Sequence, residues 1–155
     1  MSAVNKGFTL LELMVVMAIM SLLLVMSGPS INSLNDSLEY RESVRLLTSA
    51  HQKARRAARS SGVAVDVVID AQRNRFAVTG EPRLLQENQF ASLPENLKID
   101  VVYAQEVSPG NGLAAIRFYP EGGASGGEVL IRRPSGAGVK LIVDWLIGDV
   151  RRESL

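Results

Sequence analysis

The sequence predicts an α+β protein, in which a long amino-terminal helix with a transmembrane first half packs on an antiparallel β-sheet domain. Three observations support this fold class. Residues 8–26 form an almost unbroken apolar run, apolar side chains then recur at alternating steps of four and three up to residue 58, and from residue 63 the periodicity changes to two. One apolar helix face followed by antiparallel strands packs most directly as a helix laid on a sheet.

The apolar run from Phe8 to Met26 is long enough to cross a bilayer once. Its 19 residues cover about 28 Å at about 1.5 Å per residue, close to a hydrocarbon thickness of about 30 Å. Lys6 is the only charge ahead of the run, so the residues before it are expected to stay in the cytoplasm and the rest to be exported. Glu12 is the only charge inside the run. We expect it to have a cationic partner, because an ionised carboxylate costs about 2.5–3.5 kcal/mol at the centre of a membrane helix.

The string Lys6-Gly7-Phe8-Thr9-Leu10-Leu11-Glu12-Leu13 resembles the class III signal of type IV pilins and type II secretion pseudopilins. In that family a prepilin peptidase cuts after the glycine, the new amino-terminal phenylalanine is N-methylated, and the glutamate helps subunits to join. The resemblance therefore implies a leader over residues 1–7, cleavage between Gly7 and Phe8, methylation of Phe8 and an assembly role for Glu12. Cleavage also creates a cationic α-amino group, which is a suitable partner for Glu12 whether it belongs to the same subunit or to a neighbour.

Two other interpretations of the amino terminus stay open at this point. An ordinary secretory signal has a short basic start, an apolar core of about 7–15 residues and a small-residue cleavage site. The residues Val25-Met26-Ser27 could serve as that site, which would leave Gly28 as the first residue. A plain uncleaved anchor would keep Met1. The length of the apolar run and the presence of Glu12 favour the pilin-like signal.

The helix is expected to continue beyond the apolar run, with a kink at Pro29, since proline removes a backbone donor from the helix. Type IV pilins similarly carry a proline just past the anchor. On the polar faces of this helix, acidic residues lie nearer its start and basic residues nearer its end, as the helix dipole favours. Gly62 is expected to form a left-handed cap at the end of the helix. We expect a transmembrane and assembly helix over 8–28 and its amphipathic continuation over 29–61. The apolar stripe of the second part consists of Ile31, Leu34, Leu38, Tyr40, Val44, Leu47, His51, Ala54 and Ala58.

Residues 62–155 are expected to form a periplasmic β-sheet domain. A loop with a short helical turn is expected over 80–96, a flexible hairpin loop at the glycine-rich residues 122–127, and a last tight turn at 147–150. Strands are expected over 63–70 and 75–79, which form a hairpin, and over 97–104, 113–119, 128–133 and 139–145. Residues 113–152 resemble the end of the H family of minor pseudopilins of type II secretion, and the minor pilins of type IV pili share this domain type.

No pattern in the sequence indicates catalysis, a metal or a cofactor. Cysteine is absent, and the one histidine, His51, lies on the apolar stripe, where a packed or partly exposed core histidine is expected rather than a general base. Four acids are spread over three of the predicted strands, and strand alternation predicts solvated faces for them; they are Asp66, Asp70, Asp100 and Asp144. Carboxylates and loop carbonyls would suffice for calcium, but no Asp-x-Asp-x-Asp-Gly loop occurs. The glycine-rich segment lacks the Gly-Lys-Ser or Gly-Lys-Thr of a phosphate-binding loop.

Basic residues gather at two places, near the end of the helix and at Arg151 and Arg152. Nucleic acid is one candidate ligand for both. Complementarity to the helix dipole and contacts to acidic neighbours in a filament explain the first group more simply. The near-neutral charge of the exported domain argues against strong attraction to phosphates. The first group consists of Lys53, Arg55, Arg56 and Arg59.

The resemblance implies a structural subunit without enzymatic activity, namely a minor pseudopilin in the tip complex of a type II secretion pseudopilus. It would sit in the inner membrane by a single pass with its carboxy-terminal domain in the periplasm. The implied partners are other minor and major pseudopilins, the prepilin peptidase, inner-membrane lipid and secreted protein substrates, without a cofactor. The alternative is a minor type IV pilin involved in pilus assembly or DNA uptake, in which Arg151, Arg152 or the bases at the helix end contact DNA.

Overall fold

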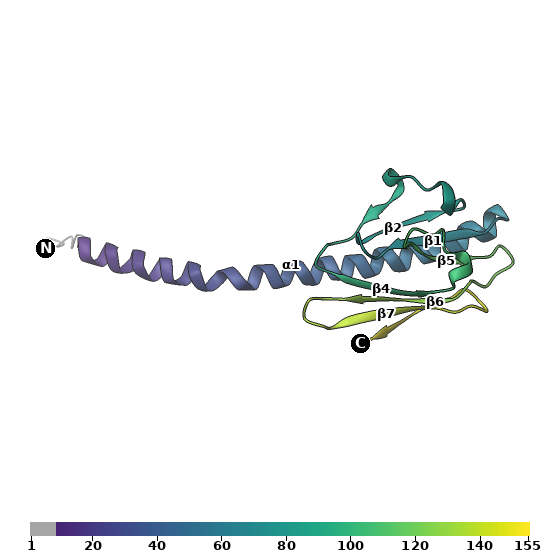
Figure 1. Ribbon diagram of the computed structural model, residues 1–155. Coiled ribbons are helices and arrows are strands. Elements are labelled where there is room, and N and C mark those ends of the chain that lie inside the picture. The colour runs from purple at the N-terminus through teal and green to yellow at the C-terminus, as the bar shows by residue number, and fades with distance from the viewer. Residues whose placement is uncertain (1–8) are drawn as a thin grey trace, which may run out of the picture. The chain divides into compact units, whose positions relative to one another are not determined.

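The structure is a computed structural model that describes residues 9–155, without the side chains of residues 24–35 (Figure 1). Two compact units divide the chain between Leu38 and Glu39, and the helix α1 (Leu10–Ser61) contributes to both. The predicted cleavage and methylation site at Gly7 and Phe8 lies outside the described residues. The side chain of Pro29, where the kink is predicted, lies outside them as well.

The first unit contains the amino-terminal part of α1. The side chains of residues 9–23 are exposed on every face of the helix, and this surface is largely apolar. Leu10 is 78% exposed and Met17 is 66% exposed. Among the residues that the structure describes, no helix combines the length and the apolar character needed to cross a membrane.

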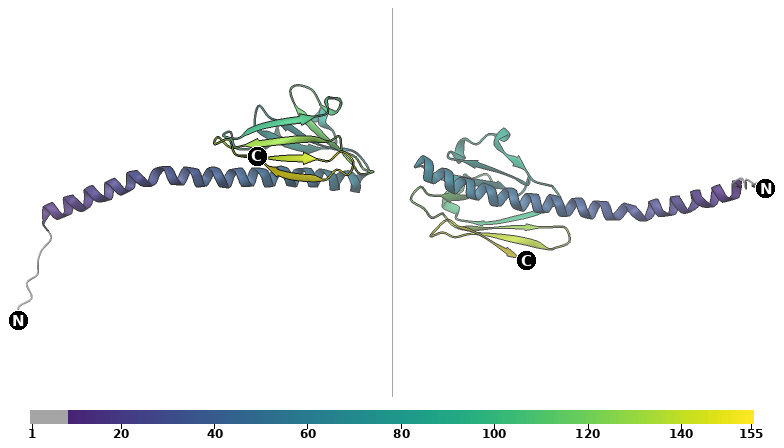
Figure 2. Two further views of the ribbon diagram at one scale, coloured as in Figure 1. Left: turned by 90° about the horizontal axis from the view of Figure 1, so that it is seen from below. Right: turned by 180° about the vertical axis from the view of Figure 1, so that it is seen from behind.

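The second unit contains eight strands. Figure 2 shows the sheets lying alongside the carboxy-terminal part of α1. The eight strands form two four-stranded antiparallel sheets, in the orders β3-β2-β1-β5 and β4-β6-β7-β8, where the sequence predicts one sheet. The strands are β1 (Val65–Asp70), β2 (Arg75–Thr79), β3 (Ala91–Ser92), β4 (Lys98–Tyr103), β5 (Ala114–Phe118), β6 (Gly127–Arg132), β7 (Gly138–Val143) and β8 (Val150–Ser154).

A helix packed on antiparallel strands confirms the predicted α+β class. Gly62 has a φ of 71° and its N–H donates to the carbonyl oxygen of Ala58 (3.1 Å), so the left-handed cap is confirmed. The six predicted strands correspond to β1, β2, β4, β5, β6 and β7. The predictions did not include β3, β8 or the 3-10 turn η3 (Gln105–Val107); the loop over 80–96 contains two such turns, η1 (Pro82–Leu84) and η2 (Glu87–Gln89).

One hydrophobic core joins the helix to both sheets. The helix contributes Leu47, Ala54 and Ala58, all fully buried, and the small alanines allow strands to approach the helix closely. The strands contribute apolar residues from alternate positions, because successive side chains of a strand point to opposite faces. These are chiefly Val65, Val67, Ile69, Phe76, Ile99, Ala114, Ile116, Phe118, Val129, Ile131, Leu141 and Val143.

The other face of the β3-β2-β1-β5 sheet is covered as well. Val68 points away from the shared core and packs with Val107 and Ala115 in a second apolar cluster. Leu85 and Phe90, from the loop after β2, cover this cluster together with residues near η3. All six residues of β1 are therefore buried, and a polar side chain on either face of β1 must find its partner inside the protein.

Candidate functional site

The predicted assembly residue Glu12 lies in the first turn of α1. Thr9 immediately precedes the helix, and its Oγ1 accepts a hydrogen bond from the backbone N–H of Glu12 (3.2 Å). The carbonyl oxygen of Thr9 accepts from the N–H groups of Glu12 and Leu13 (3.1 and 3.2 Å). Thr9 is therefore the N-cap and Glu12 the third helical residue, which are the positions of a Thr-x-x-Glu capping box. The sequence prediction omits Thr9, although the pattern is visible in Thr-Leu-Leu-Glu.

The first turn of a helix favours a carboxylate, but only weakly. A helix amino terminus stabilises a nearby negative charge by about 0.3–1 kcal/mol. Holding that charge within hydrocarbon costs more, about 2.5–3.5 kcal/mol at a helix centre and less near an end. The helix dipole alone therefore leaves Glu12 in need of a cation if the surrounding apolar surface enters a membrane or a bundle of helices.

In the second unit, Asp66 and Asp70 correct the prediction of solvated faces, since their residues are only 1% and 7% exposed. Asp66 lies opposite Arg117 in the β1–β5 register. Its two carboxylate oxygens accept from Nε and Nη2 of Arg117, at 2.7 Å each. These hydrogen bonds raise the pKa of Arg117. The acids do lie on the face away from the helix, as alternation requires, but loops cover that face.

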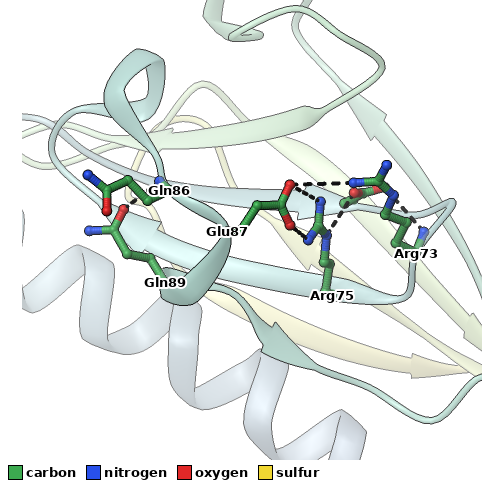
Figure 3. Close-up of polar contacts among 6 residues, drawn as sticks. Arg73, Arg75, Gln86, Glu87 and Gln89 are labelled. Carbon is green, nitrogen blue, oxygen red and sulfur yellow. Dashed lines mark hydrogen bonds and ion pairs between the residues drawn. The ribbon is translucent and has the colours of Figure 1, made fainter.

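Asp70 belongs to a cluster of ion pairs, and Figure 3 shows its members Arg73, Arg75 and Glu87. Arg75 Nε donates to Asp70 Oδ2 (2.9 Å), and the guanidinium of Arg75 also binds Glu87 on η2. Arg73 reaches the same Glu87 carboxylate at 3.5 Å. The hydrogen bonds from Arg75 lower the pKa of Glu87, and the Arg75 guanidinium lies 4.3 Å from the ring centroid of Phe90. The cluster therefore fastens the loop after β2 to the β1–β2 hairpin.

The two remaining acids are more accessible. Asp100 is paired with Arg132 at 3.2 Å, and its side chain is 59% exposed. Asp144 is paired with Arg151 at 3.4 Å, and its side chain is 30% exposed. Across residues 9–155, no three His, Cys, Asp or Glu side chains are grouped so that they could hold a metal ion.

His51 is fully buried in the core, as predicted from the apolar stripe. Its Nδ1–H donates to the carbonyl oxygen of Leu47 (2.7 Å), and its ring meets that of Phe118 edge-on with centroids 6.1 Å apart. Nε2 has no hydrogen-bond partner among the described residues. Burial lowers the pKa of His51 below its ordinary value, because the imidazolium would lose its hydration.

The stability of the second unit is expected to depend on His51 as the pH falls. The unfolded chain takes up a proton near pH 6.5, whereas the folded chain takes it up only at a lower pH. The free energy of unfolding should therefore be constant above pH 6.5 and decrease below it, by up to about 1.4 kcal/mol for each unit of pKa difference. Urea unfolding of the full chain in detergent, followed by circular dichroism between pH 7.5 and 5, measures this decrease. His51→Leu should flatten the profile, and an unchanged slope in that variant would contradict the assignment.

The basic residues at the end of α1 lie beside the turn between β7 and β8. Arg55 Nη1 is 3.4 Å from Asp149 Oδ1. A shallow groove of about 230 Å³ is lined by Arg55, Arg56, Arg59, Gln52 and Asp149. The structure thus brings three of the four predicted helix-end bases to one place, next to a carboxylate from the carboxy-terminal part of the chain.

The structure thus combines a capped amino-terminal helix, which carries an acid in its first turn, with a second unit in which the same helix packs on antiparallel strands. This is the arrangement expected from the resemblance to pilin-like proteins. Residues 3–28 match the family model of the prokaryotic N-terminal methylation motif. Over 146 residues the chain is 24% identical to the type II secretion system protein H of Xanthomonas campestris pv. campestris. The match covers 94% of this chain and 82% of that protein.

The fold itself is similar to a solved structure, that of the minor pseudopilin EpsH from the type 2 secretion system of Vibrio cholerae. The TM-score is 0.57 at 14% sequence identity, and the match covers 75% of this chain and 97% of that one. Together the motif, the relative and the fold confirm the resemblance to minor pseudopilins that the sequence predicts.

Proposed function

We propose that the protein is a minor pseudopilin, a structural subunit of a type II secretion pseudopilus that supports protein export. The observation that carries the proposal is that one chain joins the N-terminal methylation motif to a unit with the fold of a minor pseudopilin. The similarity to a type II secretion system protein H over nearly the whole chain supports the same function. In this proposal the subunit acts by assembly and carries out no catalysis.

The proposed mechanism begins with removal of residues 1–7 by a prepilin peptidase and methylation of Phe8. Residues 8–28 then anchor the chain in the inner membrane by a single pass, with a kink at Pro29 before the amphipathic continuation over 29–61. The β-sheet domain over 62–155 lies in the periplasm. During assembly the apolar helices of several subunits bundle side by side, which removes their exposed apolar surface from lipid or water.

Glu12 gives the bundle its register in this proposal. Its carboxylate, which the helix start stabilises only weakly, pairs with an α-amino group created by cleavage after Gly7. The partners are other minor and major pseudopilins, with which the chain forms a tip complex that touches inner-membrane lipid at its base and secreted proteins at its tip.

Mass spectrometry of the mature chain and a secretion assay test the proposal. We expect the membrane-extracted chain to begin with methylated Phe8, and deletion of its gene to stop secretion of a type II substrate while surface pili persist. A mature chain that begins at Gly28 or Met1 would refute the pilin-like processing.

The alternative of a minor type IV pilin makes the opposite prediction. Deletion would then abolish pili and spare secretion. If the chain served DNA uptake, it would also retard duplex DNA at about 50 mM salt and lose that binding as the salt concentration rises.

A further inference from the structure

The turn between β7 and β8 exposes three large apolar side chains in succession. Trp145 is 70% exposed, Leu146 65% and Ile147 47%. Contiguous exposed apolar side chains mark surfaces that contact other molecules, and tryptophan is among the residues that contribute most to the affinity of protein interfaces. These three side chains are not part of the hydrophobic core of the second unit.

Hydrogen bonds within the turn fix its backbone. Asp144 Oδ1 accepts from the N–H groups of Leu146 and Ile147 (2.9 and 3.2 Å). The N–H of Gly148 donates to the carbonyl oxygen of Asp144, and the N–H of Asp144 donates to that of Asp149, both at 2.9 Å. The apolar side chains are thus held outward by a closed turn, which lowers the entropy cost of ordering them on binding.

The glycine-rich segment packs against the backbone of this turn and is held there by a hydrogen bond. This corrects the flexible hairpin loop that the sequence predicts. The N–H of Ala124 donates to the carbonyl oxygen of Trp145 (2.9 Å). A Cβ on Gly123 would lie 2.9 Å from that same oxygen, and a Cβ on Gly148 would lie 2.9 Å from the carbonyl oxygen of Gly123. Both glycines also have positive φ (75° and 62°). Only glycine fits this close approach of the two backbones.

The groove at the end of α1 gives this surface a charged border. Asp149 belongs both to the turn and to the groove, where it pairs with Arg55. Arg56 and Arg59 line the same groove and have no acidic partner within the described part of the chain. Nε of Arg55 is buried and lacks a hydrogen-bond acceptor among the described residues. Three guanidinium groups against one carboxylate leave the groove with a surplus of positive charge.

We propose that Trp145, Leu146 and Ile147, together with the arginine groove, form the docking surface for the globular domain of a neighbouring pilin-like subunit. The partner would receive the tryptophan in an apolar pocket and place carboxylates against Arg56 and Arg59.

Asp144 and Asp149 are already paired with Arg151 and Arg55, so the surface has a net positive charge. A rigid turn with a projecting tryptophan beside fixed cations fits the shaped pocket and fixed carboxylates of a folded protein, and contact with lipid is the opposing outcome of the test below. This inference rests on the proposed function, because it takes a filament subunit as the partner.

Photo-crosslinking of the full chain in the producing bacterium tests the inference. The variant Trp145→p-benzoylphenylalanine should form a crosslink to a protein that mass spectrometry identifies as another bearer of the N-terminal methylation motif. Leu84→p-benzoylphenylalanine is the matched control, since Leu84 is also 70% exposed but lies on η1, and it should give little of this product. Adding Arg56→Glu and Arg59→Glu to the first variant should reduce the crosslink. Adducts to lipid alone, or equal yields at both positions, would overturn the inference.

Affinity provides a second measurement. Trp145→Ala should weaken co-purification with that partner roughly 30-fold, which is the loss expected for an interface residue worth about 2 kcal/mol. Its thermal unfolding should match that of the unsubstituted chain because the side chain is exposed. If the unsubstituted chain enters the pseudopilus and Trp145→Ala binds equally well, the docking surface is wrong and the proposed function stands. If the unsubstituted chain neither assembles nor supports secretion, the proposed function itself is wrong.

Discussion

Replacing Arg117 by alanine is expected to lower the free energy of unfolding of the second unit by about 3 kcal/mol or more. The Asp66 side chain is 2% exposed and accepts two hydrogen bonds from Arg117, at 2.7 Å each. Removing the guanidinium leaves a buried carboxylate with neither a cation nor water, and that uncompensated charge costs more than the pair itself contributes. Urea unfolding of the full chain in detergent, followed by circular dichroism, measures the loss.

The chain offers a matched control for this loss. Arg132 is likewise paired with an aspartate, Asp100, across two strands, but the two side chains are 39% and 59% exposed. Because water can take over the solvation of an exposed charge, Arg132→Ala should cost less than about 1 kcal/mol. The double variant Asp66→Val with Arg117→Met removes both charges and should recover much of the lost stability. Equal losses for Arg117→Ala and Arg132→Ala would refute the role of burial.

Replacing Glu12 by alanine is expected to leave cleavage after Gly7 intact and to reduce incorporation into the pseudopilus on the order of 30-fold. The α-amino cation of the mature chain would then stay unpaired among apolar helices, and a loss of about 2 kcal/mol corresponds to that factor. The amount of chain in sheared pseudopilus fractions, relative to processed chain in the membrane, measures the effect.

Two variants separate the charge of Glu12 from its place at the helix start. Glu12→Gln keeps the size of the side chain but removes the charge, and it should assemble as poorly as Glu12→Ala. Thr9→Ala removes the Oγ1 that accepts from the Glu12 N–H, costs about 1 kcal/mol of helix stability and should reduce incorporation much less. Normal assembly of Glu12→Gln would show that assembly does not require the negative charge of Glu12.

The helix and most strands could be predicted because each has a periodicity of its own. The polar stretch Arg151-Arg152-Glu153-Ser154 shows no alternation, so β8, whose residues from Arg151 on are exposed, has no such signal. The division into two sheets depends on strand order, and in both sheets strands pair across long stretches of intervening chain, as β1 does with β5. The local sequence pattern of a strand does not show which distant strand it pairs with.

Only a motif allows candidate site residues to be named from the sequence. Gly7, Phe8 and Glu12 belong to one short signal and their roles stay predictions, and Thr9 lies in the same signal with a recognisable capping pattern. The burial of Asp66 and Asp70 could not be predicted, because alternation identifies two faces of a strand without showing that loops cover both. The packing of the glycine-rich segment against the turn after β7 could not be predicted either, because the segment contacts Trp145, about 20 residues further along the chain.

The position of Trp145 has an optical consequence. It is the one tryptophan of the sequence, and it lies on the exposed turn with most of its indole in contact with solvent. The tryptophan emission of the chain, excited selectively beyond the absorption of its tyrosines, therefore reports on that single place, with no background from a buried indole. Docking of a neighbour should move the emission to shorter wavelengths and shield it from a soluble quencher, so the unlabelled protein can signal its own assembly in real time.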